Sequence, residues 1–89
     1  MKHVVIRVSG RVQGVFFRAS AKAQAERLGI KGIVRNEPSG DVYIEAEGDD
    51  DVVPLFLQWC SRGPDGARVD HVTSREASPK GFASFEIKR

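Results

Sequence analysis

The sequence has very little cysteine: Cys60 is its one thiol in 89 residues, so the chain cannot form an internal disulfide bond. It has no CxxC or HExxH motif and no other close grouping of cysteine and histidine, so no familiar metal site is present. No apolar run approaches the ~20 residues of a membrane-spanning helix, and neither end has the pattern of a targeting segment. We therefore expect a cytoplasmic protein with no metal, no cofactor and no membrane contact.

An excess of charge of one sign is also lacking. Fourteen Lys and Arg stand against twelve Asp and Glu, which gives a net charge of +2, and the basic residues are scattered along the chain. Nucleic-acid-binding domains usually carry clustered basic residues, so we expect a small anionic ligand and no nucleic acid. At this length, with 40% hydrophobic residues and no linker or repeat, residues 1–89 are expected to form a single domain.

The first half of the chain predicts a strand, a helix and a hairpin. Residues 3–9 alternate β-branched and other side chains in period two, which favours a strand. Residues 17–28 are rich in helix formers and place Phe17, Ala21, Gln24 or Ala25, and Leu28 on one stripe. Two further strands are expected within 31–48, around a turn at 36–40.

The second half predicts one more helix and two strands. Three aspartates, residues 49–51, precede an apolar stripe of Val52, Phe56, Trp59 and Cys60. Pro54 fits only the first turn of this helix, which favours Asp50 or Asp51 as its cap. Strands are expected within 67–77 and 82–89. The order β-α-β-β-α-β, with a short extra strand, predicts an α+β, ferredoxin-like fold in which a mostly antiparallel sheet of four or five strands carries both helices on one face.

The stretch SGRVQGVFFR, residues 9–18, joins the first strand to the first helix. Gly10 and Gly14 bracket the connection, and glycine permits positive φ and close approach of the backbone to a ligand. Successive N–H groups at a helix N-terminus bind anions, and the guanidinium of Arg18 can bind two phosphate oxygens at once. The stretch thus suits a phosphate-like group, although a simple tight turn with a solvated arginine has the same composition. It matches neither GxxxxGK[ST] nor GxGxxG, which argues against a nucleotide.

Two signatures in the chain resemble those of the acylphosphatase family. The first is the run from Val8 to Arg18, which fits at every specified position. The second comprises Gly32, Val34, Arg35, Asn36, Gly40, Val42 and Gly48. The resemblance extends from Val4 to Ile87 and includes the RGP after the second helix.

The resemblance implies a monomeric, metal-independent hydrolase that splits the carboxyl-phosphate anhydride of small acyl phosphates into a carboxylate and inorganic phosphate, with phosphate as a competitive inhibitor. It assigns binding of the phosphoryl oxygens to Arg18 and orientation of the attacking water to Asn36. The amides of the loop share the phosphoryl group with Arg18, and they belong to Gln13, Gly14, Val15, Phe16 and Phe17. Ile33 replaces an expected aromatic residue, and Glu37 follows Asn36 where many relatives have threonine. A carboxylate facing the loop at that position would repel phosphate.

Two other functions remain open at this point. RNA-recognition domains share the same order of elements, and Lys80, Gly81, Phe82 and Ala83 begin like their RNP1 motif, but Ser84 and Ile87 stand where aromatic residues should stack. The other alternative is a phosphate-binding module without turnover. His3 and His71 have no second ligand nearby in sequence, so we interpret them as ordinary strand residues.

Overall fold

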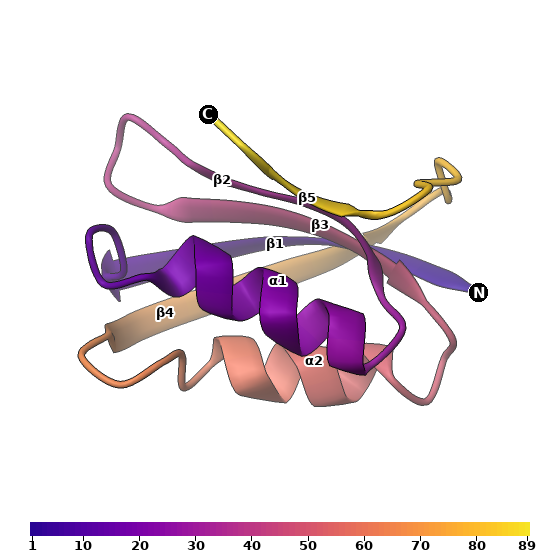
Figure 1. Ribbon diagram of the computed structural model, residues 1–89, viewed down its shortest axis with the longest axis horizontal. Helices are drawn as coiled ribbons and strands as arrows, with labels where there is room; N and C mark the ends of the chain where they lie inside the picture. Colours follow the sequence, from indigo (N-terminus) through magenta and orange to yellow (C-terminus); the bar gives the residue numbers. More distant parts are fainter.

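The computed structural model describes residues 1–89. Along the chain it contains β1 (Lys2–Arg11), α1 (Phe17–Arg27), β2 (Lys31–Asn36), β3 (Val42–Gly48), α2 (Val53–Cys60), β4 (Arg68–Ala77) and β5 (Phe85–Lys88). The five strands form one sheet in the order β4-β1-β3-β2-β5, in which β2 and β5 are parallel and all other neighbours antiparallel. Both helices cover the same face of the sheet (Figure 1). The predicted ferredoxin-like α+β fold is confirmed.

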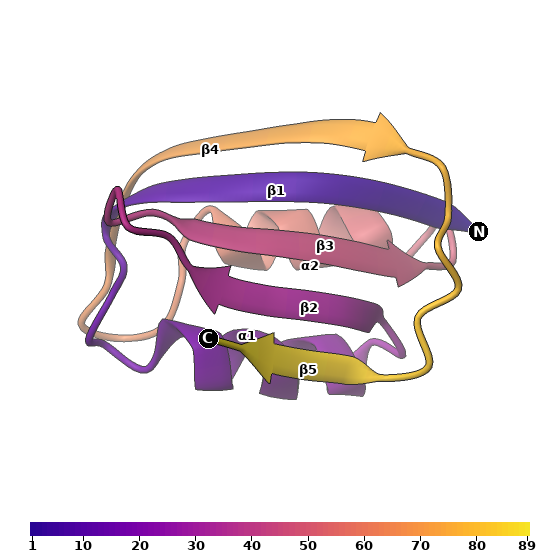
Figure 2. The same ribbon diagram turned by 90° about the horizontal axis from the view of Figure 1, so that it is seen from above.

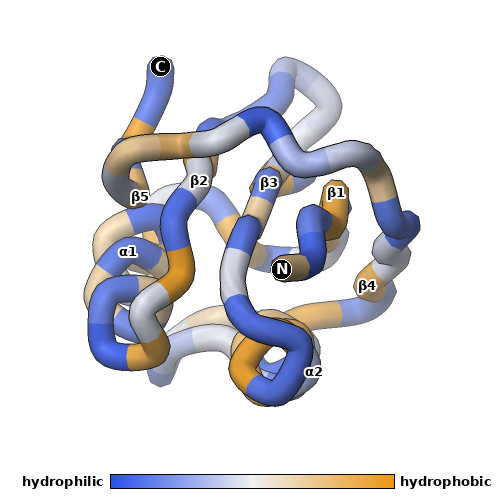
Figure 3. The backbone as a smooth tube through the Cα atoms, turned by 90° about the vertical axis from the view of Figure 1, so that its right-hand side faces the viewer, coloured by the Kyte–Doolittle hydropathy of each residue, from blue (hydrophilic) through white to orange (hydrophobic).

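The core lies between the sheet and the two helices. Alternate residues of β1 and β3 face the helices and are fully buried, as the period-two pattern predicts: Val4, Ile6, Val8, Val42, Ile44 and Ala46. Seen along the sheet in Figure 3, α1 lies beneath β2 and β5, and α2 beneath β1 and β3. The helices contribute Phe17, Ala21, Ala25, Val53, Phe56 and Cys60. Neither helix is long and apolar enough to span a membrane.

Cys60 behaves as the small apolar residue that its place on the helix stripe predicted. Its side chain is fully buried in the core. Burial raises the pKa of its thiol because the thiolate would lose its hydration. The one cysteine of the chain is therefore a packing residue.

The first strand is longer than predicted, and this changes the role of Gly10. β1 continues to Arg11, so Gly10 lies within the strand, and only Gly14 belongs to the loop. The register between β1 and β4 shifts between Ser9 and Gly10. A Cβ atom on Gly10 would lie 2.2 Å from the carbonyl oxygen of Arg68, so glycine is required here by the close approach of β4.

The predicted cap of the second helix is wrong. Val52 is the N-cap residue of α2, and neither Asp50 nor Asp51 caps it, because no side chain makes a capping hydrogen bond. The backbone carbonyl of Asp49 instead accepts hydrogen bonds from the N–H groups of Val52 and Val53, at 3.1 and 3.2 Å. This turn places both aspartate side chains ahead of the cap position. Pro54 lies in the first turn, as expected.

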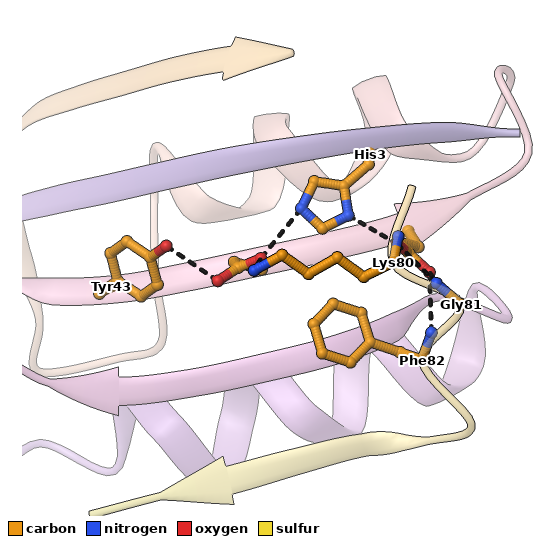
Figure 4. Close-up of polar contacts among 7 residues, drawn as sticks. His3, Tyr43, Lys80, Gly81 and Phe82 are labelled. Carbon is orange, nitrogen blue, oxygen red and sulfur yellow. Dashed lines mark hydrogen bonds and ion pairs between the residues drawn. The ribbon is translucent and has the colours of Figure 1, made fainter. Parts of the chain in front are cut away.

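A buried polar cluster holds the segment between β4 and β5 against the open face of the sheet (Figure 4). The carboxylate of Glu47 accepts hydrogen bonds from the backbone N–H groups of Lys80, Gly81 and Phe82, the last at 3.0 Å. The N–H group of Phe82 is therefore unavailable to a sheet ladder, and β5 begins at Phe85 and not at 82 as predicted. The residues that resemble an RNP1 motif form this anchored loop.

His3 is not an ordinary strand residue, contrary to the prediction. Its side chain is 1% exposed, and its Nδ1 lies 2.7 Å from Oε2 of Glu47. Its Nε2 lies 3.0 Å from Oε1 of Glu45, and the ring of Phe82 stacks on the imidazole with centroids 5.9 Å apart. Lys80 pairs with Glu45 at 2.9 Å, so this carboxylate is also compensated.

The cluster makes Glu47 an unusually strong acid. Burial by itself would raise the pKa of its carboxyl group, but hydrogen bonds from the backbone of Lys80, from His3 and from the backbone of Phe82 and Gly81 outweigh burial. The pKa is therefore about 2, against an ordinary value of 4.5. Because the folded state favours the charged form, Glu47 stabilises the fold above pH 4.5 and ceases to do so as the pH falls toward 2.

We predict that Glu47→Gln lowers the free energy of unfolding by roughly 1–3 kcal/mol at neutral pH, since the amide presents one acceptor and two donors to three backbone donors. Urea denaturation of both proteins at pH 7 and pH 3 measures the difference, which should shrink at the lower pH. Glu26→Gln, on the exposed face of α1, is the matched control and should change little. Equal stability of Glu47→Gln and the unmodified protein at pH 7 would contradict the prediction.

Candidate functional site

The loop of residues 12–16 and the start of α1 border a cavity at one edge of the sheet. Figure 2 shows that the carboxyl ends of β1, β2 and β5 meet at this edge. The cavity has a volume of about 300 Å³ and is lined by Val12, Gly14, Phe16, Phe17, Arg18, Ala19, Asn36 and Ile87. Arg18 and Asn36, which the family resemblance singled out, thus line one cavity, together with three of the five predicted loop residues.

The N-terminus of α1 is open toward this cavity. Phe16 is its N-cap residue, with no capping side chain and no acidic residue in the first turn. The first backbone hydrogen bond runs from the N–H of Ser20 to the carbonyl of Phe16, at 3.0 Å. The N–H groups of Phe17, Arg18 and Ala19 therefore donate to no backbone carbonyl. Free donors at the positive end of a helix dipole form an anion-binding arrangement.

Arg18 adds a full positive charge at the same place. A cation in the first turn is disfavoured by the helix dipole, and a bound anion removes that cost. The guanidinium pairs with no carboxylate. Its one hydrogen bond is from Nη1 to the backbone carbonyl of Lys88 in β5, at 3.4 Å. The contact orients the side chain and leaves its charge uncompensated.

Asn36 contributes an acceptor that no protein group satisfies. It is the last residue of β2 and is paired with Val42, so its side chain lies on the helix side of the sheet. Its Oδ1 atom is buried and accepts no hydrogen bond from the protein. A buried acceptor without a donor costs about 1–3 kcal/mol. A water or ligand donor in the cavity would remove that cost.

Glu37 does not bring a negative charge into the cavity. Its carboxylate lies 3.6 Å from the guanidinium nitrogens of Arg7 and Arg35 on the opposite face of the sheet. Arg35 also lies over the ring of Tyr43, 4.2 Å from its centroid. Because these ion pairs hold the Glu37 carboxylate on the open face, this departure from the family pattern does not place a charge that would repel phosphate in the cavity.

Gln13 and Val15, two of the predicted loop residues, do not line the cavity. Val15 packs against the core. The side-chain amide of Gln13 donates from Nε2 to the backbone carbonyls of Glu37, at 2.8 Å, and of Asp41, at 2.9 Å. Gln13 thus ties the loop to the turn that follows Asn36.

The sequence reasoning missed the part that Gln13 and Ile87 have in the site. Gln13 bonds to backbone carbonyls, and such partners leave no mark in the residue pattern. Ile87 reaches the cavity because it pairs with Val34 in parallel register, which puts its side chain on the helix side of the sheet. Parallel pairing of the last strand with β2, had it been predicted, would have placed Ile87 beside the site. No three His, Cys, Asp or Glu side chains are grouped to hold a metal ion.

Comparison with known proteins agrees with this geometry. The family model described as acylphosphatase matches residues 4–87. An acylphosphatase of Methylococcus capsulatus is 49% identical over 90 residues, which covers 100% of this chain and 98% of that protein. The fold matches the crystal structure of acylphosphatase from Bacillus subtilis with a TM-score of 0.97, at 32% identity and full coverage of both chains. It also matches an acylphosphatase from Coxiella burnetii with a TM-score of 0.95, at 36% identity, over 98% of this chain and 92% of that one. With residues of both signatures on one cavity and these relatives matched over nearly their whole length, the chain belongs to the acylphosphatase family and hydrolyses acyl phosphates.

Proposed function

We propose that the cavity holds the phosphoryl group of the acyl phosphate between the start of α1 and Arg18, and that Asn36 orients the attacking water. The observation that carries this proposal is the coincidence, in one cavity, of free helix N–H groups, a guanidinium without a carboxylate partner and a buried unsatisfied amide oxygen. The backbone N–H groups of residues 13–17 and the guanidinium of Arg18 would donate to the oxygens of the phosphate dianion.

In the proposed step the water oxygen attacks phosphorus and the bond from phosphorus to the acyl oxygen breaks. The electron pair of that bond leaves with the carboxylate, and the water oxygen becomes part of inorganic phosphate. Phosphoryl transfer depends mainly on positioning and on stabilisation of charge, which the Arg18 guanidinium and the loop amides supply. A carboxylate leaving group is stable at neutral pH, so it needs no general acid.

Asn36 positions the water without adding charge. Its Oδ1 accepts a hydrogen bond from the water, which directs a lone pair of the water oxygen toward phosphorus. No Asp, Glu or His lines the cavity. We therefore assign the proton released by the water to an oxygen of the substrate phosphate.

The proposal further includes a monomeric, cytoplasmic enzyme that works without a metal, with residues 1–89 acting as one domain. One sheet and one contiguous core support the single domain. Sedimentation as a species near 9.8 kDa tests the monomer, and a dimer mass would contradict it. Recovery in a membrane or secreted fraction would contradict the cytoplasmic location.

The first expected result is hydrolysis of benzoyl phosphate, followed by the loss of its ultraviolet absorbance, at an unchanged rate in the presence of a chelator. Inorganic phosphate should inhibit competitively, because the product occupies the same donors. Loss of activity with chelator would contradict the metal-independent mechanism. Phosphate binding without any turnover would indicate a phosphate-binding module.

Arg18→Ala should lower kcat/KM for benzoyl phosphate by roughly 10²–10³-fold or more, and should weaken inhibition by phosphate, because the main source of positive charge is lost. Arg18→Lys should also lose most activity, since a point charge cannot form the bidentate contact. Arg27→Ala, in the last turn of the same helix, is the control and should retain activity. Near-normal turnover of Arg18→Ala would remove this residue from the mechanism.

Asn36→Ala should lower kcat by roughly a hundredfold with little change in the phosphate inhibition constant, because it removes the water contact and leaves the anion site intact. Its thermal midpoint should be maintained or raised, since the buried Oδ1 has no partner to lose. Steady-state kinetics and thermal unfolding of the same preparation measure both effects. A parallel loss of phosphate affinity would instead place Asn36 in the anion site.

A further inference from the structure

Phe16 is unusual because its exposure, its backbone conformation and its place in α1 do not favour phenylalanine. Its side chain is 83% exposed. Its φ of 61° makes it the one non-glycine residue of the chain with positive φ. An aromatic residue in the left-handed region costs roughly 1–2 kcal/mol, and at an N-cap position serine, aspartate or asparagine would be favoured. Exposure, backbone strain and the missing cap all disfavour phenylalanine here.

The position of Phe16 relative to the cavity supplies a reason for an aromatic side chain. Phe16 lines the cavity together with Ile87, another large apolar residue that is 41% exposed. The two come from different elements, Phe16 from the start of α1 and Ile87 from β5. Val12 and Ala19 extend the apolar lining. Apolar side chains thus remain open beside the polar groups that suit a phosphate.

The lining also limits what kind of acyl group fits. Arg18 and Asn36 are the two polar side chains among the lining residues, and both are engaged by the phosphoryl group and the water in the proposed mechanism. No further polar or charged side chain lines the cavity. Its volume of about 300 Å³ lies at the lower end of the range for small-molecule sites.

We propose that Phe16 and Ile87 form a subsite for the acyl group, which makes the enzyme selective for acyl phosphates with an apolar acyl group over those with a short or charged one. This inference rests on the proposed function, because it places the phosphoryl group at the start of α1 and so leaves the acyl group beside Phe16. Contact with the acyl group would offset the strain and exposure of the aromatic side chain.

The test compares kcat/KM for benzoyl, acetyl and succinyl phosphate, whose acyl groups are aromatic, short and charged. The unmodified enzyme should prefer benzoyl phosphate over both others by about tenfold or more. In Phe16→Asn, which tolerates positive φ, the ratio of benzoyl to acetyl phosphate should fall roughly tenfold, mainly through a higher KM for benzoyl phosphate. Phe16→Leu should keep most of the ratio, and Ile87→Thr should lower it in the same direction.

Leu55→Ala is the matched control, because Leu55 is 51% exposed on α2 and does not line this cavity. Its substrate ratio should be unchanged. A change in the loop backbone would slow all substrates alike, so the ratio isolates contact with the acyl group. An unmoved ratio in Phe16→Asn would overturn the subsite, whereas no turnover of any substrate by the unmodified protein would overturn the proposed function.

Thermal unfolding of Phe16→Asn gives an independent readout. Asparagine relieves the strain at positive φ and can cap α1, so the midpoint should rise. A lower midpoint would show that packing within the fold accounts for Phe16, and would overturn the proposal.

Discussion

The insertion of β3 between β1 and β2 is the constraint on which the arrangement of the site depends. Because β3 is antiparallel to both neighbours, β1 and β2 run in the same direction, and β5 follows as the parallel partner of β2. The carboxyl ends of these three strands therefore lie at the same edge of the sheet (Figure 2). There Arg18 lines one cavity with Asn36 and donates to the backbone carbonyl of Lys88. The side-chain amide of Gln13 donates to the backbone carbonyls of Glu37 and Asp41, and so fixes the loop relative to the β2–β3 turn.

The alternation of side chains along β2 and into the turn places Asn36 and Glu37 on opposite faces of the sheet. Asn36 lies toward the helices, while the carboxylate of the next residue, Glu37, lies among arginines on the open face. The cavity is thus left with one charged side chain, Arg18. No carboxylate that would repel an anion lines the cavity, although the chain as a whole carries almost as many acids as bases.

The fold, and the candidate residues Arg18 and Asn36 that line one cavity, could be predicted from the sequence because they follow from local patterns. Period two predicted β1, the helix stripe predicted the buried face of α1, and the spacing around Arg18 and Asn36 carried the family resemblance. The cap of α2, the buried state of His3 and the late start of β5 could not be predicted. The last two depend on contacts between distant segments, because they arise from Glu47, which binds a loop more than thirty residues further along the chain. The start of α2 depends on the backbone carbonyl of Asp49, and a backbone acceptor leaves no mark in the residue pattern.

β5 is a short edge strand, with four residues paired only to β2. It carries the Lys88 carbonyl that orients Arg18 and the apolar side chain of Ile87. Local opening of an edge strand requires much less free energy than global unfolding. Fraying of β5 would therefore dismantle the site while the central strands stay protected from hydrogen exchange. Loss of activity at a denaturant concentration below the midpoint of global unfolding is therefore the expected sign of fraying at β5.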